Sequence, residues 1–138
     1  MSFLLDTNVL SELRKGRRCD SCVREWAKTA EPELHTSVVA LGELKRGVER
    51  VRRKDPRFAA ELERWLTRLI ATMGSRILPV DRAIALEWGR FSAPRSVPPI
   101  DGLLAATALV RGMTLVTRNV KDFADLGVSY LNPFEASQ

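Results

Sequence analysis

The sequence predicts an α/β fold, with a central and mostly parallel sheet that is flanked by helices. Short apolar runs alternate with segments whose apolar residues recur at helical spacing, and this alternation is typical of parallel sheets with crossover helices. The clearest helix is 56–73, which begins at a proline, keeps its apolar residues on one face and ends before Gly74. A chain of 138 residues, 45% of them hydrophobic, is long enough to bury a core and is expected to form one domain.

Five apolar runs are expected to be the strands, because each is short and is bounded by polar residues, glycine or proline. In chain order they are Phe3–Leu5, Leu34–Thr36, Ile77–Val80, Thr114–Val116 and Val128–Leu131. The helices are expected between them, where apolar residues recur every three or four positions. In chain order they are 7–15, 20–29, 38–53, 56–73, 81–92 and 101–112, followed by a short turn near 121–126. Strands and helices therefore alternate, as crossover connections require.

The charge balance limits the partners of the chain. The 22 Lys and Arg residues outnumber the 17 Asp and Glu residues, and a net charge of +5 favours an anionic partner, either a nucleic acid or an acidic protein. Basic residues are densest over 45–57, which is either a solvated helix face or a phosphate-binding surface. No apolar run approaches the roughly 18 residues of a membrane span, and no signal peptide pattern is present. We therefore expect a cytoplasmic protein without membrane contact.

The two cysteines, Cys19 and Cys22, form a CxxC pair, a spacing found in redox sites and in halves of zinc sites. The sequence has no second CxxC, and His35 is its only histidine, so four nitrogen and sulfur ligands for zinc cannot be assembled. The pair lies in a polar segment after a helix, not directly after a strand. We therefore expect no metal or redox role for this pair, and a structural role for His35 inside its predicted strand.

Several polar residues stand where a parallel sheet binds its ligands. Asp6 follows the first strand, so it is a candidate metal ligand or acid–base group, and the alternative is that it caps the next helix. Asp101 begins an apolar helix, where the helix dipole alone also favours an acid. Glu43 lies among apolar residues of another helix, where a lone charge is costly. Asn119 and Asp122 lie just beyond the fourth strand.

These residues are harder to explain together than singly. Carboxylates that converge repel each other and raise at least one pKa, and a divalent cation removes that repulsion. A ligand set of oxygen atoms, without His or Cys, suits Mg²⁺ or Mn²⁺ better than zinc. Mg²⁺ takes few carboxylates and keeps waters and phosphate oxygens as its other ligands. The residues therefore point to phosphoryl or phosphodiester chemistry in a basic protein.

Four segments, in this order, carry a resemblance to a known family. They are LLDTNVLSEL, SVVALGELKRGVER, PIDGLLAATALVRG and LVTRNVKDF. Together they resemble the PIN-domain family, and most of all the VapC-type toxin ribonucleases of toxin–antitoxin systems and their FitB-like relatives. The resemblance covers roughly 3–134 and implies a single PIN domain over 1–138, with a three-layer fold and an acidic pocket at the strand ends. It also implies an Mg²⁺- or Mn²⁺-dependent ribonuclease, dimeric and neutralised by a partner antitoxin.

The resemblance implies a role for each polar residue. Asp6 and Asp101 would hold the principal Mg²⁺, and Glu43 would hold a bound water or a second metal. The fourth position is open between Asn119, where many members carry Asp, and Asp122, one helical turn later. The expected catalytic residues are Asp6, Glu43, Asp101 and Asp122, the expected metal ligands are Asp6, Asp101, Glu43 and Asn119, and the supporting hydroxyls are those of Thr7 and Thr117.

The sequence thus predicts a metal-dependent endoribonuclease that acts as the toxin of a type II toxin–antitoxin system. Its expected partners are RNA, a cognate antitoxin, DNA only through that antitoxin, and a second copy of the chain at the apolar helix 56–73. One alternative, which Asn119 favours, is a catalytically weak PIN-like binding protein acting through an antitoxin–DNA complex. Another is a receiver-type phospho-acceptor domain, but that class usually has adjacent acids after its first strand, whereas this chain has Asp6-Thr7-Asn8.

Overall fold

The computed structural model describes residues 1–135 and contains a five-stranded sheet. The strands are β1 (Phe3–Leu5), β2 (Leu34–Ser37), β3 (Ile77–Leu78), β4 (Thr114–Val116) and β5 (Tyr130–Leu131). Their order across the sheet is β3-β2-β1-β4-β5, with β1 in the centre. Every neighbouring pair is parallel, so all five strands end at the same edge of the sheet. The predicted α/β class with a parallel sheet is confirmed.

Six α-helices connect and cover these strands within residues 1–135. They are α1 (Thr7–Leu13), α2 (Ser21–Ala30), α3 (Val38–Arg52), α4 (Pro56–Met73), α5 (Arg82–Ser92) and α6 (Pro99–Arg111). Short 3₁₀ turns occupy η1 (Gly16–Arg18), η2 (Gly74–Arg76), η3 (Val120–Asp122) and η4 (Ala124–Leu126). No helix in this part of the chain combines the length and the apolar character needed to cross a bilayer.

The sheet separates two hydrophobic cores, as expected for a three-layer arrangement. Leu5 and Val116 belong to the core formed with α1, α2, α3 and α4. Leu4 and Leu115 belong to the other core, formed with α5 and α6. Successive side chains of a strand point to opposite faces, so adjacent leucines on β1 serve different cores. All four side chains are at most 1% exposed, so the ends of β1 and β4 lie in the interior of the molecule.

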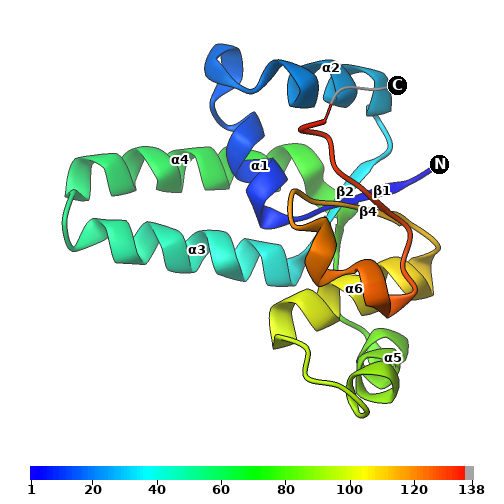
Figure 1. The fold of residues 1–138 in the computed structure, drawn as a ribbon. Coiled ribbons are helices and arrows are strands. Elements are labelled where there is room, and N and C mark those ends of the chain that lie inside the picture. Colours follow the sequence, from blue (N-terminus) through cyan, green and yellow to red (C-terminus); the bar gives the residue numbers. More distant parts are fainter. Residues whose placement is uncertain (136–138) are drawn as a thin grey trace.

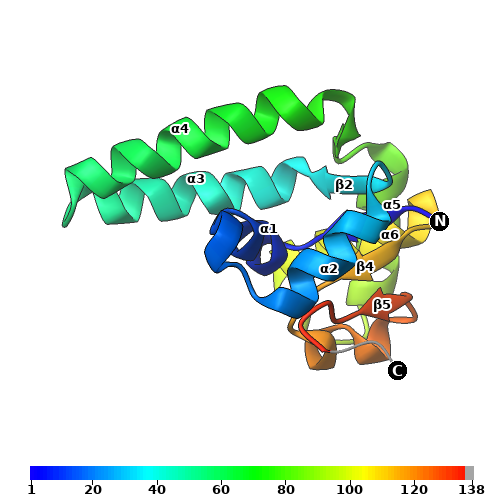
Figure 2. The ribbon, with the colours of Figure 1, turned by 90° about the horizontal axis from the view of Figure 1, so that it is seen from above.

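Helices α3 and α4 form a long antiparallel hairpin that projects away from the sheet (Figures 1 and 2). Four ion pairs join its charged face, because Lys45 and Arg52 on α3 each contact both Glu49 and Glu63 at N–O distances of 2.6 to 3.0 Å. Two of the basic residues of 45–57 are therefore already neutralised by carboxylates. Four others line an open surface hollow and make no ion pair within residues 1–135; they are Arg46, Arg50, Arg53 and Lys54.

The observed elements differ from the expected ones mainly at their ends. β3 was expected over Ile77–Val80 but ends at Leu78, because its partner β2 ends at Ser37, which caps α3, and Pro79 has no N–H to donate. β5 is limited to Tyr130–Leu131 by its two register partners on the three-residue strand β4. Helix α6 begins at Pro99, so Asp101 lies within its first turn and does not begin the helix.

Candidate active site

The candidate site lies at the carboxyl ends of β1 and β4, which are neighbours in the sheet. Leu5 of β1 is in register with Val116 of β4, so the next residues along each strand, Asp6 and Thr117, come side by side. The hydroxyl Oγ1 of Thr117 donates a 2.8 Å hydrogen bond to Oδ2 of Asp6. Both side chains are buried, Asp6 at 6% exposure and Thr117 at 0%. The sheet register alone therefore fixes the first acid and its hydroxyl partner.

Asp6 has the cap role that the sequence allowed for it, and it makes further hydrogen bonds beyond that role. It is the N-cap residue of α1, and its Oδ1 accepts a 2.7 Å hydrogen bond from the backbone N–H of Thr7. Caps usually accept from the second or third N–H of the helix, whereas this bond goes to the first. Its Oδ2 also accepts a 3.3 Å bond from the Asn8 amide. Both oxygens are thus oriented by donors, which a simple cap does not require.

Glu43 reaches the site from α3, through the same threonine. The Thr7 hydroxyl donates a 2.6 Å hydrogen bond to Oε1 of Glu43, while the Thr7 backbone N–H bonds Asp6. Thr7 therefore connects two carboxylates that are 37 positions apart in the sequence. Glu43 is half-buried, in agreement with its apolar neighbours on the helix.

Asp101 lies in the first turn of α6 and is half-buried. Burial is the largest cause of the raised pKa of Asp101, which reaches about 6, and the charges of Asp6, Asp122 and Glu43 add to it in that order of importance. Burial also raises the pKa of Asp6, while the hydrogen bonds from Thr117 and Thr7 lower it and the charges of Glu43 and Asp122 raise it. The four carboxylates therefore lie close enough to repel each other, as expected for converging acids.

Asn119 and Asp122, the two candidates for the fourth position, contribute different groups to the site. Asp122 lies exposed in η3, and its charge acts on both Asp6 and Asp101. Asn119 contributes its backbone, because its N–H donates a 3.0 Å hydrogen bond to Oγ1 of Thr117. Within residues 1–135 the Asn119 side chain makes no hydrogen bond, and it is exposed. The carboxylate of Asp122 is thus the one that is coupled to the cluster.

Sequence reasoning gave Asn8 no role, yet its amide joins both strand ends. Nδ2 of Asn8 lies 3.3 Å from Oδ2 of Asp6 and 3.3 Å from Oγ1 of Thr117, and it donates to both. Its Oδ1 accepts a 3.1 Å bond from the backbone N–H of Arg118. The signal was the unbroken polar run Asp6-Thr7-Asn8 directly after a buried strand, in which each residue bonds the site.

The donor set consists only of oxygen atoms, which suits Mg²⁺ or Mn²⁺. Within residues 1–135, no three His, Cys, Asp or Glu side chains are arranged so that they would chelate a metal together. Mg²⁺ does not require such a group, because it takes few carboxylates directly and keeps waters as its other ligands. Burial and, after it, repulsion by the other acids raise the pKa of Asp101, and a bound cation would relieve that repulsion.

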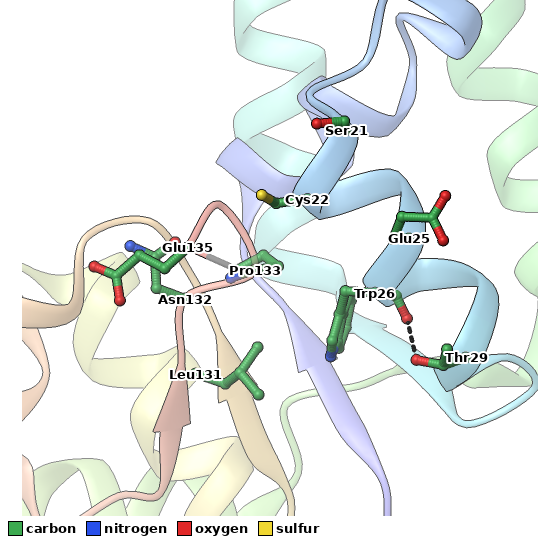
Figure 3. A pocket seen from close by; sticks show the side chains of 9 residues that line it. All are labelled: Ser21, Cys22, Glu25, Trp26, Thr29, Leu131, Asn132, Pro133 and Glu135. Atoms are coloured by element: carbon green, nitrogen blue, oxygen red, sulfur yellow. Dashed lines mark hydrogen bonds between the residues drawn. The ribbon is translucent and has the colours of Figure 1, made fainter. Parts of the chain in front are cut away.

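Other polar features of the sequence lie away from this cluster. His35 sits on β2, where its Nδ1 is 3.0 Å from the Glu33 carbonyl oxygen. Cys19 and Cys22 are free thiols; Cys19 is buried, and burial raises its pKa. Cys22 lines a hollow of about 620 Å³ between α2 and the end of β5 with the segment after it, and Trp26 lines the same hollow from α2 (Figure 3). That hollow contains none of the candidate site residues.

Comparison with known proteins matches most of the chain to one protein family. The family model described as PIN domain matches residues 3–128. The chain is 30% identical to the plasmid stability protein StbB of Pseudomonas syringae pv. tomato, over 96% of this chain and 99% of that protein. It is also 30% identical to the tRNA(fMet)-specific endonuclease VapC of Shigella flexneri, over 92% of this chain and 93% of that protein.

Solved structures give the same result. The FitAB complex bound to an IR36 DNA fragment contains a chain with a TM-score of 0.83 and 25% identity, covering 99% of this chain and 98% of that one. A toxin–antitoxin complex from Klebsiella pneumoniae contains a chain with a TM-score of 0.66 and 25% identity, covering 97% and 99%. The similarity extends over nearly the full length of both chains in each comparison.

Proposed function

Because this chain belongs to the PIN-domain family, we propose that it is a metal-dependent endoribonuclease and the toxin of a type II toxin–antitoxin pair. The observation that carries the proposal is the convergence of Asp6, Glu43, Asp101 and Asp122 at the carboxyl edge of the sheet, with the pKa of Asp101 raised to about 6. A relative at 30% identity is named an endonuclease, which supports the same chemistry. The proposed substrate is a phosphodiester bond of RNA.

In this proposal Asp6 and Asp101 hold the principal Mg²⁺ or Mn²⁺, and Glu43 holds a water or a second metal. The ion would lower the pKa of a bound water and offset negative charge on the phosphate oxygens. Thr117 and Thr7 position the carboxylates, because each hydroxyl donates directly to one of them. Such donors typically matter for metal affinity and activity almost as much as the ligands themselves. Asp122 completes the negative field from η3.

The proposed partners follow from the comparisons and from the surface. The cognate antitoxin would neutralise the toxin, since a similar chain is found in a toxin–antitoxin complex, and it would also carry the pair to DNA. A second copy is proposed to pack on α4, which leaves Phe58 36% and Ile70 44% exposed. Sedimentation of the purified chain at micromolar concentration tests the dimer, and a monomer would contradict it. We propose a cytoplasmic location, where RNA and antitoxin are both present.

A second candidate function rests on Asn119, which stands where many family members carry Asp. A weaker fourth position would favour a binding protein that acts only through its antitoxin–DNA complex. Within residues 1–135 no hydrogen bond holds the exposed Asn119 side chain in place. Its amide is therefore not fixed as a substitute for the carboxylate that many family members have at this position. The coupling of Asp122 to Asp6 and Asp101 favours the nuclease over this alternative.

The test compares two acid-to-amide changes, both at helix N-caps. Asp6→Asn removes a charge from the site, and Asp55→Asn makes the same change at the N-cap of α4. Purified wild type should cleave RNA with Mg²⁺ or Mn²⁺ and stop when EDTA is added. Asp6→Asn should lose cleavage, and Asp55→Asn should keep it, because asparagine caps a helix about as well as aspartate. Full cleavage by Asp6→Asn, or none by the wild type with either metal, would defeat the nuclease and leave the binding protein.

A further inference from the structure

Arg118 occupies a fixed place at the rim of the carboxylate site. It lies between Thr117, whose hydroxyl bonds Asp6, and Asn119, whose N–H bonds that same hydroxyl. Its own backbone N–H donates a 3.1 Å hydrogen bond to Oδ1 of Asn8. The backbone of Arg118 is thus tied to the network that orients the buried acid, although its side chain is 57% exposed.

The Arg118 side chain is also held in place. Its Cζ atom lies 3.7 Å from the centroid of the Phe134 ring, a close cation–π contact with the segment after β5. One terminal nitrogen lies 3.9 Å from Oε1 of Glu12, a carboxylate buried on α1. Phe134 therefore covers one face of the guanidinium, and Glu12 anchors one end of it.

These contacts leave the N–H groups of Arg118 available. Glu12 already accepts from the backbone N–H of Asp20 at 2.8 Å and from Nζ of Lys15 at 3.0 Å, so its longer contact with Arg118 is electrostatic. Within residues 1–135 the guanidinium of Arg118 donates no hydrogen bond, whereas that of Arg52 donates three hydrogen bonds to glutamates. An ordered guanidinium with open donors has already lost its side-chain freedom before a ligand arrives.

The open donors suit a phosphate. A guanidinium presents paired N–H groups that match two oxygens of a phosphate, and its edges stay accessible when one face is stacked. A polyanion that enters a cluster of four carboxylates also needs a cation beside them. We propose that Arg118, positioned by Phe134 and Glu12, binds a backbone phosphate of the RNA strand that enters the site. This rests on the proposed function for the identity of the ligand, but not on cleavage.

The test measures binding without cleavage. A short fluorescent single-stranded RNA is titrated with the full chain in EDTA, and anisotropy gives the affinity at a series of salt concentrations. One lost phosphate contact should reduce the slope of log K against log salt by ~0.7 for a single strand. Arg118→Ala should show that reduction. Arg111→Ala removes a charge of the same kind at the C-terminal end of α6, which is the end away from Asp101. Arg111 pairs with Asp81 there, so this variant should leave the slope unchanged.

Two further variants separate contact from structure. Arg118→Lys keeps the charge, so it should keep the salt slope while losing affinity through the missing fork of donors. Phe134→Leu should behave alike, because it frees the guanidinium without removing it. A purely structural role for Arg118 would lower Tm and leave the slope of Arg118→Ala unchanged, which overturns the proposal. Absence of RNA binding by the wild type also overturns it, whereas binding without cleavage in Mg²⁺ removes only the proposed nuclease.

Discussion

The carboxylate cluster and the α3–α4 hairpin are both dense in charge, but charges are paired with opposite charges in the hairpin and lie beside like charges in the cluster. In the hairpin, each of Lys45 and Arg52 has two carboxylate partners at the surface. In the cluster, the acids have each other as neighbours, and burial with mutual repulsion raises the pKa of Asp101 to about 6. Charge that is balanced at the surface contributes modestly to stability. Carboxylates that lie together without cationic partners destabilise the fold, and sites of this kind are often functional.

The two regions also differ in how they are assembled. Two of the hairpin ion pairs lie within α3, where Glu49 is only three or four positions from its partners, and two join α3 to the next helix. The cluster draws Asp6, Glu43, Asp101 and Asp122 from four separate segments of the chain. A local run of charge therefore says little about function, because local partners neutralise it. Acids that are distant in sequence but meet at one sheet edge carry more information.

The largest expected effect compares one acid-to-amide change in each region. Asp101→Asn should lower RNA cleavage by at least about a hundredfold, since even the groups that support a metal ligand cost about ten- to a hundredfold when removed. Glu63→Gln on the hairpin should leave cleavage unchanged, because its partners Lys45 and Arg52 lie outside the site. Initial rates with saturating Mg²⁺ measure both. Equal losses in the two variants would break the distinction between the regions.

Metal binding should stabilise the fold through the cluster alone. At a Mg²⁺ or Mn²⁺ concentration a hundred times the dissociation constant, the wild type should gain ~2.7 kcal/mol of unfolding free energy. Asp101→Asn should lose most of that gain, and Glu63→Gln should keep all of it. Thermal unfolding followed with and without metal is the measurement. A gain of the same size in Asp101→Asn would remove Asp101 from the metal site.

Removal of the Thr117 hydroxyl tests whether the hydrogen-bond donors around Asp6 position its carboxylate. Thr117→Val deletes the 2.8 Å bond to Asp6 without changing the volume much, and it should lower activity by about ten- to a hundredfold. Thr107→Val is the matched control, because the Thr107 hydroxyl is also buried but bonds only the Leu103 carbonyl within α6. Cleavage rates and Tm are measured for both. A loss of activity that merely follows the loss of Tm would contradict the positioning role.

The smallest expected effect concerns how Tm changes with pH in the absence of metal. Relative to wild type, Asp101→Asn and Glu63→Gln should change Tm in opposite directions as pH rises. The pKa of Asp101 is raised to about 6, so its ionisation destabilises the fold as pH rises from about 4 through 6. The Tm advantage of Asp101→Asn over wild type should therefore be absent below that range, grow through it and be complete above it. Hydrogen bonding from Lys45 lowers the pKa of Glu63, so Glu63→Gln should cost stability above pH 4.5 and cost nothing well below it. Scans of Tm against pH in EDTA test both. The same sign for both variants would refute the comparison.

Much of the fold was predictable from local pattern. Leu4 and Leu5 mark a buried strand, and the one-sided apolar face of 56–73 marks α4, which has the expected bounds. The family resemblance is confirmed by the match to the PIN domain over 3–128. Strand ends were less accurate, because a strand stops where its partner stops. The end of β3 at Leu78 depends on Ser37 of β2, which no local pattern contains.

The site was predictable in its acids but not in its connections. Asp6, Glu43 and Asp101 stand out because an acid beside apolar residues is unusual, and Thr7 and Thr117 followed from the family resemblance. Asn8 was missed, because an amide at a helix start has common structural uses, and only the sheet register brings it to Thr117. The ion pairs of Glu63 with α3 were missed for a similar reason, since they depend on how two helices face each other.

The two leucines of β1 have a consequence for how the molecule opens. Leu4 and Leu5 belong to different cores, and the next residue is the first acid of the cluster. Partial unfolding of either layer removes half the support of this three-residue strand, so the cluster should persist only while both layers are intact. The backbone N–H groups of Asp6 and Thr117, which bond Val116 and Leu131, should therefore exchange with deuterium only by global opening. An intermediate that has lost one layer but keeps an assembled cluster is not expected, and protection at these two amides should report the whole domain.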